Sequence, residues 1–149
     1  MADLQALDLE LRRLVYEKLM AGGTVPLIST LVSATGTTQA NIRDALRRLS
    51  DAHMFVLQRN GEILMANPFS AVPTPFLVSI GQSSWYGNCI WDAIGIAAML
   101  RGKARIETSC GCCGTAMTLQ APDDCTDDDE RVAHFALPAA RWWDDIVFN

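Results

Sequence analysis

The 149-residue sequence lacks any apolar run of the roughly 18 residues that a membrane-spanning helix requires. Its first residues, MADLQALDLELRR, also lack the basic-then-apolar order of a secretory signal. We therefore expect a cytoplasmic protein with no membrane partner. Histidine is scarce as well: His53 and His134 lie far apart in the chain, and neither is favoured as a metal ligand.

The sequence also has no excess of basic residues, since it contains 12 basic and 17 acidic side chains. Residues 1–66 carry seven basic and seven acidic side chains, whereas residues 67–149 carry five and ten, which gives the net charge of −5. Proteins that bind nucleic acid through its phosphates need a basic surface. The composition therefore argues against nucleic acid as a partner. The sequence does not decide whether the protein forms a homodimer.

Residues 1–66 predict three helices followed by a hairpin. Apolar residues recur at helical spacing in the first fifty residues, and Asn60-Gly61 between two short apolar runs is a strong signal for a tight turn. Three helices followed by a hairpin is the order of a winged helix. Half of the sequence is hydrophobic, which is enough to build a core.

The third predicted helix, over residues 38–50, has two faces. Thr37 or Thr38 can cap its start, and its inner face is predicted to hold Ile42, Ala45, Leu46 and Leu49. Its outer face would carry Arg43, Arg47 and Arg48. These arginines could read DNA or form a solvated face, and the acids between and beside them, Asp44 and Asp51, favour the solvated face.

Residues 67–76 contain Pro68, Pro73 and Pro75 and predict an extended connector without helix or strand. Residues 77–149 then predict a small mixed β-sheet domain around a buried helix that runs from Cys89 to about Arg101. Strands are expected in the segments FLVSI, ARIETSC, TAMTLQA and VAHFALP, and a final helix near ARWWDDIVFN. The fold class is therefore α+β, with domains at 1–66 and 77–149.

The stretch WYGNCIWDAIGIAAMLRG places a thiol and a carboxylate three residues apart. Asn88 is the predicted N-cap, so Cys89 would lie in the first turn, where the helix dipole and free amides favour the thiolate. Asp92, one turn on, would share a dry pocket that raises its pKa and suits it to proton transfer. The alternative is a packed Cys89 and a structural Asp92.

The four remaining cysteines are confined to residues 110–125. The segment CGCCG brings Cys110, Cys112 and Cys113 within four positions, between glycines, where they can bind a soft ion. A closed zinc site usually needs a second pair of ligands, and none follows at zinc-site spacing. Cys125 lies in the acidic loop PDDCTDDDE and could be free or a ligand.

The segment YGNCIWDAIGIAAMLRGKARIETSCGCCGTAMTL resembles the centre of the alkylmercury (organomercurial) lyase family. The shared pattern is Cys-x-x-Asp, an apolar helix, a glycine, an Ala-Arg-Ile strand and a further cysteine. The NPFSAVPTPF segment and the helical half resemble the family as well. The resemblance implies protonolysis of a carbon–mercury bond, with Cys89 and Asp92 as catalytic, metal-binding residues and Cys110 as a structural cysteine.

One family feature is not matched. The family has a second catalytic cysteine after a Leu-Pro landmark, which Leu137-Pro138 fits, and this cysteine would fall at or just beyond Asn149. Either this cysteine is missing by truncation or another thiol substitutes for it, and the candidates that would then bind metal are Cys112 and Cys113. The alternative is a non-catalytic soft-metal or organometal binder that uses Cys89 and the Cys110–Cys113 loop. No cofactor is expected; mercury would be substrate and product, and small thiols would be partners.

Overall fold

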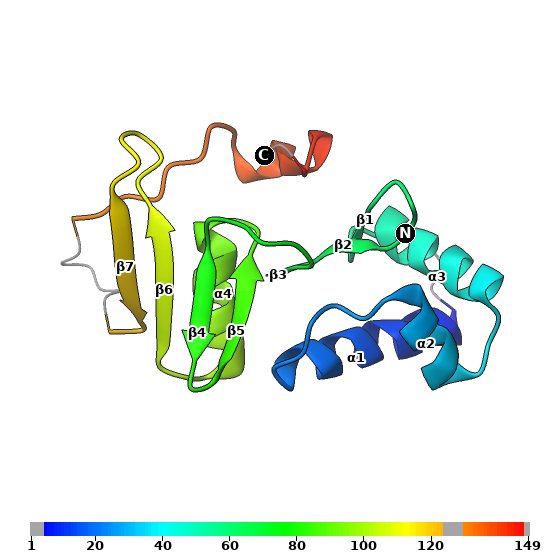
Figure 1. The fold of residues 1–149 in the computed structure, drawn as a ribbon. Coiled ribbons are helices and arrows are strands. Elements are labelled where there is room, and N and C mark those ends of the chain that lie inside the picture. The colour runs from blue at the N-terminus through cyan, green and yellow to red at the C-terminus, as the bar shows by residue number, and fades with distance from the viewer. Residues whose placement is uncertain (1–4, 124–129, 148–149) are drawn as a thin grey trace.

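The computed structural model describes residues 5–123 and 130–147 and has the α+β class that the sequence predicts. Three helices and a hairpin come first, and further strands follow, with helix α4 lying against one face of them (Figure 1). The elements are α1 (Ala6–Met20), α2 (Ile28–Thr35), α3 (Gln39–Asp51), β1 (Val56–Leu57), β2 (Ile63–Ala66), β3 (Phe69–Ser70), β4 (Leu77–Ile80), β5 (Ser83–Gly87), α4 (Ile90–Leu100), β6 (Ala104–Ser109), β7 (Ala116–Ala121) and the 3₁₀ helix η1 (Ala139–Asp144).

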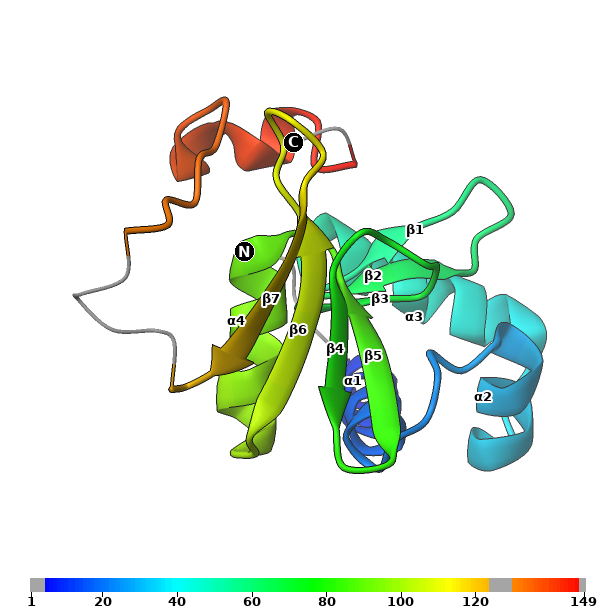
Figure 2. The ribbon, with the colours of Figure 1, turned by 60° about the vertical axis from the view of Figure 1, so that its left-hand side comes forward.

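The described strands form one sheet in the order β1-β2-β3-β5-β4-β6-β7, and every neighbouring pair is antiparallel. Strand β4 lies between β5 and β6, with Leu77 opposite Tyr86 on one side and Glu107 on the other. Since β5 and β6 are both antiparallel to β4, they end at the same end of the sheet. The start of α4 and the β6–β7 turn therefore lie at that end (Figure 2).

The expectation that residues 67–76 contain no strand is wrong. Phe69 and Ser70 form β3, which pairs with β2 on one side and with β5 on the other. The prolines do not prevent this pairing because none of them lies within the two-residue strand. Phe69 is fully buried and belongs to a core cluster that includes residues from both sides of this segment. The division into two domains stays a prediction.

The core forms where the apolar stripes of the helices meet the sheet. Thr38 caps α3 by accepting a hydrogen bond from the Asn41 amide at 3.2 Å. The predicted inner face of α3 is confirmed, since its four residues are fully buried: Ile42, Ala45, Leu46 and Leu49. On the other side of the core, Trp85 Nε1 donates to the Leu19 carbonyl at 2.8 Å and ties β5 to the end of α1.

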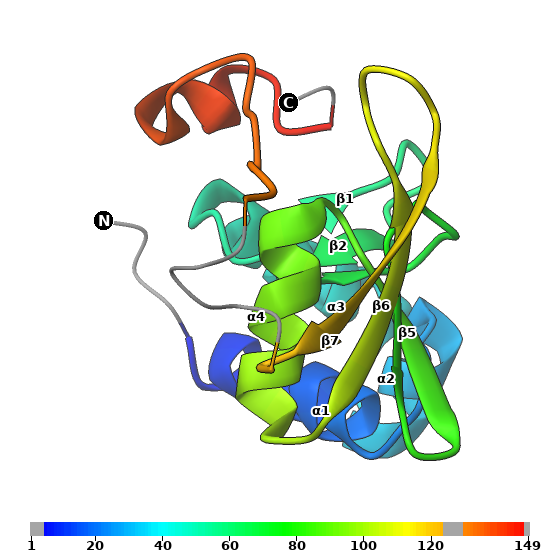
Figure 3. The same cartoon turned by 90° about the vertical axis from the view of Figure 1, so that its left-hand side faces the viewer.

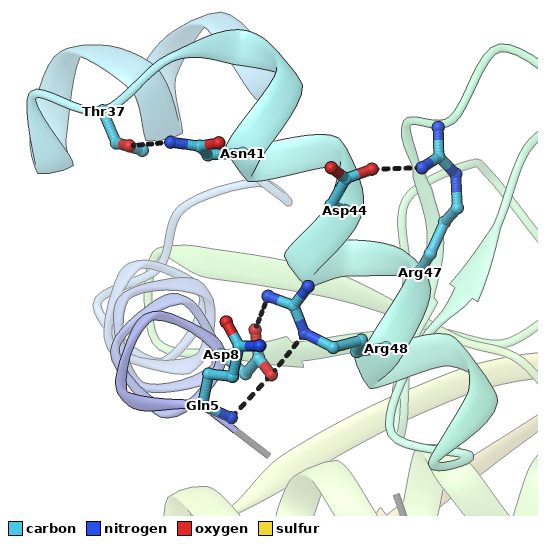
Figure 4. A network of polar contacts seen from close by, with 7 residues as sticks. All are labelled: Gln5, Asp8, Thr37, Asn41, Asp44, Arg47 and Arg48. Carbon is cyan, nitrogen blue, oxygen red and sulfur yellow. Dashed lines mark hydrogen bonds and ion pairs between the residues drawn. The ribbon is translucent and has the colours of Figure 1, made fainter. Parts of the chain in front are cut away.

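The arginines of α3 are occupied by contacts within the protein. Arg48 donates from Nε and Nη2 to the two carboxylate oxygens of Asp8, at 2.9 and 2.7 Å, and Asp8 is fully buried (Figure 4). Arg47 forms an ion pair with Asp44 on the same helix. Arg43 donates to the Asn60 carbonyl in the hairpin at 2.6 Å. Arg47 is exposed, as predicted for the outer face, whereas Arg43 and Arg48 are half-buried and join α3 to other elements.

The C-terminal segment differs from the sequence prediction. The segment VAHFALP forms no strand, and a 3₁₀ helix replaces the expected helix near Arg141. Trp143 stacks on His53 with ring centroids 4.1 Å apart, so it packs on the end of α3 and not on the core. The segment lies at the end of the sheet where α4 begins (Figure 3). No helix in residues 5–123 or 130–147 is long and apolar enough to cross a membrane.

Candidate functional site

Cys89 lies directly between β5 and α4. It is the N-cap residue of α4, in an extended conformation, and its carbonyl accepts a hydrogen bond from the Ala93 amide at 3.0 Å. The prediction that Asn88 caps the helix is therefore wrong by one residue. Gly87 makes this junction possible: a Cβ at Gly87 would lie 2.8 Å from the Ala93 nitrogen. The last residue of β5 thus packs against the backbone of the first helical turn.

Asn88 does not cap α4, and its side chain instead binds Asp92 and Asn67. Its Nδ2 donates to Asp92 Oδ2 at 3.0 Å and to Asn67 Oδ1 at 3.1 Å, and it lies 3.4 Å from the Pro68 carbonyl. Asn88 Oδ1 is buried without a hydrogen-bond partner. Asn88 therefore holds the Asp92 carboxylate against the segment that leads into β3. The sequence reveals the right residue here but not its role.

The thiol of Cys89 and the carboxylate of Asp92 interact and influence each other's protonation. Burial raises the pKa of Asp92, and the hydrogen bonds from Asn88 and Cys89 oppose this effect. The predicted rise in the pKa of Asp92 is confirmed. Burial also raises the pKa of Cys89, the Asp92 charge adds to the rise, and the amides of Asp92 and Trp91 oppose it. The expected preference for the thiolate is therefore outweighed by burial.

A tyrosine from α1 completes this polar cluster. Tyr16 Oη donates to the Asn67 carbonyl at 2.7 Å, and the Tyr16 ring packs beside Phe55 and Phe69. Burial raises the pKa of Tyr16; the Arg12 charge lowers it, and the nearby Asp92 charge raises it further. Sequence reasoning missed Tyr16 and Asn67 because they are far apart in the chain and neither belongs to a motif.

Helix α4 is less enclosed than the sequence suggests. Its buried residues are Ala93, Ile96 and Ala97, whereas the Trp91 residue is 64% exposed. The expectation of a buried helix therefore holds for one face only, because no further described layer covers the other. The helix ends at Leu100, and its C-cap residue Arg101 adopts the left-handed conformation. Cys89 and Asp92 are half-buried at the opposite end.

The β6–β7 turn holds three of the other cysteines. Cys110 is half-buried, whereas Cys112 and Cys113 are exposed. Thr115 lowers the pKa of Cys113 through its hydroxyl and its backbone, and the Cys110 thiol adds to this effect. No group of three or more His, Cys, Asp or Glu side chains in the described parts of the chain is arranged to hold a metal ion. Cys125 lies outside the described residues.

A hollow of about 410 Å³ lies near the far end of α4. It is lined by Ile94, Ala97 and Ala98 from the helix, by Arg101 to Lys103, and by residues 121–123 after β7. Neither Cys89 nor Asp92 contributes to it. We place the candidate site at the Cys89–Asp92 pair and not in this hollow, because the hollow holds no interacting thiol and acid.

Comparisons with known proteins relate the chain to one family and one fold. The family model MerB, described as alkylmercury lyase, matches residues 69–148. The solved structure of the mercury-bound form of MerB2 is similar, with a TM-score of 0.61 and 19% sequence identity over 83% of this chain. The similarity spans 64% of that protein's length, and at this identity it shows the fold alone. No curated protein matches the chain.

Proposed function

Because this chain belongs to the alkylmercury lyase family, we propose that it cleaves carbon–mercury bonds by protonolysis. Cys89 binds the mercury and Asp92 moves the proton. The observation that carries this proposal is the interacting Cys89–Asp92 pair at the start of α4, with Asn88 holding the acid. The family match covers the residues of this arrangement apart from Tyr16, Asn67 and Pro68.

The raised pKa values of the two groups suit a relay of one proton. The free protein keeps Cys89 as a thiol, and a soft metal ion displaces the thiol proton when the sulfur–mercury bond forms. Asp92 takes that proton, because burial favours its neutral form. It then delivers the proton to the carbon bound to mercury. The carbon–mercury bond breaks, its electron pair forms the new carbon–hydrogen bond, and mercury stays on sulfur as Hg(II).

The surroundings of the pair support this chemistry. Half-burial limits the access of water, which strengthens the interaction between thiol and acid. The exposed side of α4 leaves a route for an organomercurial and for the small thiol that removes the product. We propose that Cys112 or Cys113 supplies a second sulfur. Both leave the sheet at the end where Cys89 lies.

The test is the release of benzene from phenylmercury in the presence of excess small thiol. Wild-type protein is expected to release benzene, and Cys89→Ser to release none above background. Asp92→Asn should still bind one equivalent of phenylmercury but release benzene about 10²- to 10⁴-fold more slowly, the usual contribution of a positioned acid. Asp44→Asn, which changes an exposed acid on α3, is the control and should match wild type.

Two results would contradict the proposal. The first is release by Cys89→Ser at the wild-type rate, which would remove the thiol from the reaction. The second is equal rates for Asp92→Asn and Asp44→Asn, which would remove the acid. If wild-type protein takes up mercury but releases no benzene, the alternative function, a non-catalytic soft-metal binder, is supported. The grouping of exposed thiols in the β6–β7 turn is the observation that favours this alternative.

A further inference from the structure

Two thiols of the β6–β7 turn are held close together. The turn is closed by hydrogen bonds from the Gly114 amide to the Cys110 carbonyl and from the Cys110 amide to the Thr115 carbonyl, both at 2.8 Å. Within this turn the Cys110 and Cys113 side chains interact, and Cys113 Sγ lies 3.1 Å from Thr115 Oγ1. The closed turn therefore brings the two cysteines of a Cys-x-x-Cys segment together at the end of β6.

The position of the turn relates it to the proposed active site. Cys89 follows Tyr86 by three residues, Cys110 follows Glu107 by three, and Tyr86 and Glu107 both face Leu77 of β4. Neighbouring strands lie about 4.8 Å apart, so β5 and β6 are separated by about 10 Å. The strands that precede these cysteines, β5 and β6, end at the same end of the sheet (Figure 2).

We propose that Cys110 and Cys113 form a second soft-metal site, which binds inorganic Hg(II) close to where the proposed reaction produces it. The identity of the ion rests on the proposed function. On binding, each thiol loses one proton and forms one sulfur–mercury bond, and the oxidation state of mercury does not change. In this role Cys110 is a ligand in addition to the structural cysteine that the family resemblance implies.

The number of ligands determines which ion fits. Two sulfur atoms complete the linear coordination that Hg(II) favours, whereas a structural zinc site needs four ligands. No larger group of ligating side chains occurs in residues 5–123 or 130–147. Two thiols on one short turn bind Hg(II) more tightly than separate thiols in solution. Once the first sulfur–mercury bond has formed, the second thiol is present at an effective concentration in the millimolar range. Monothiol well below that concentration should therefore fail to extract the ion, even when it is in excess over the protein.

The experiment uses the full-length, reduced chain with Cys89→Ser and Cys125→Ser. Hg(II) is added in the presence of excess glutathione, and bound mercury is measured by native mass spectrometry and by sulfur–mercury charge-transfer absorbance. We expect one Hg(II) retained per chain and no comparable retention of Zn(II). Adding Cys110→Ser or Cys113→Ser should weaken retention by about 10²-fold or more. Adding Ser109→Ala, an exposed residue at the end of β6, should leave it unchanged.

The proposal is overturned if the starting variant retains no Hg(II), or if adding Cys110→Ser or Cys113→Ser leaves retention unchanged. Circular dichroism of each variant verifies folding. The assay is independent of the proposed function because Cys89 is absent from every protein in it. A failure of the lyase proposal would instead appear as missing benzene release by wild-type protein, whatever the turn binds.

Discussion

Gly87 offers the sharpest test of how the fold positions Cys89 and Asp92. A Cβ at this residue would lie 2.8 Å from the nitrogen and 3.0 Å from the Cα of Ala93, and 3.2 Å from the carbonyl oxygen of Cys89. All three are backbone atoms of the start of α4, so no side chain can rotate away. Ordinary contacts begin at 3.4 Å, so Gly87→Ala requires β5 and the first turn of α4 to separate by about 0.6 Å.

This displacement has two expected consequences. Overpacking of this kind costs about 1–3 kcal/mol of unfolding free energy, which for a chain of this length lowers Tm by about 2–12 °C. The same shift moves Cys89 relative to Asp92. Since a displacement of 1 Å in an active site costs about 10²-fold in rate, we expect benzene release to fall by about 10- to 100-fold.

Gly95→Ala is the matched control on the same helix. A Cβ at Gly95 would lie 3.7 Å from Pro68 Cβ, an ordinary contact, so no atom has to move. Alanine is favoured over glycine inside a helix by about 0.5–1 kcal/mol, so Gly95→Ala should raise Tm and keep activity. Thermal unfolding by circular dichroism and benzene release measure both variants. Equal stability and activity of the two variants would refute the close packing of β5 on α4.

Two further predictions concern ionised groups. Arg48→Met should lower Tm clearly more than Arg47→Met, because Arg48 pairs with the buried Asp8 whereas Arg47 and its partner are exposed. Arg48 holds the pKa of Asp8 below its ordinary value, so the ion pair stabilises the fold at pH values above that ordinary value. The difference in Tm between the two variants should therefore narrow as the pH falls through the lowered pKa of Asp8. A difference in Tm that does not change with pH would contradict this prediction. Asn88→Ala removes a hydrogen bond that lowers the pKa of Asp92, so Asp92 should stay protonated to higher pH. In mercury-loaded protein the falling limb of the pH–rate profile should therefore shift to higher pH, and an unshifted profile would exclude Asp92 as the proton donor.

Features that depend on a few neighbouring residues could be predicted from the sequence. The three helices, the Thr38 cap, the inner face of α3 and the turn at Asn60-Gly61 all arise from local spacing and local backbone preference. The Cys-x-x-Asp spacing likewise places Cys89 and Asp92 one helical turn apart, whichever residue begins the helix. The family match over residues 69–148 confirms the resemblance seen in that segment.

The partners of these residues depended on tertiary structure. Whether Asn88 caps α4 or holds Asp92 is decided by how β5 meets the helix at Gly87, and that contact has no local signature. Tyr16 reaches Asn67 across 51 positions in the chain. The β6–β7 turn and Cys89 share one end of the sheet because β4 lies between their strands. The spacing of apolar residues in the sequence indicates which face of a helix or strand is buried. Contacts between distant elements depend on strand order and register, so they are determined only when the whole chain packs.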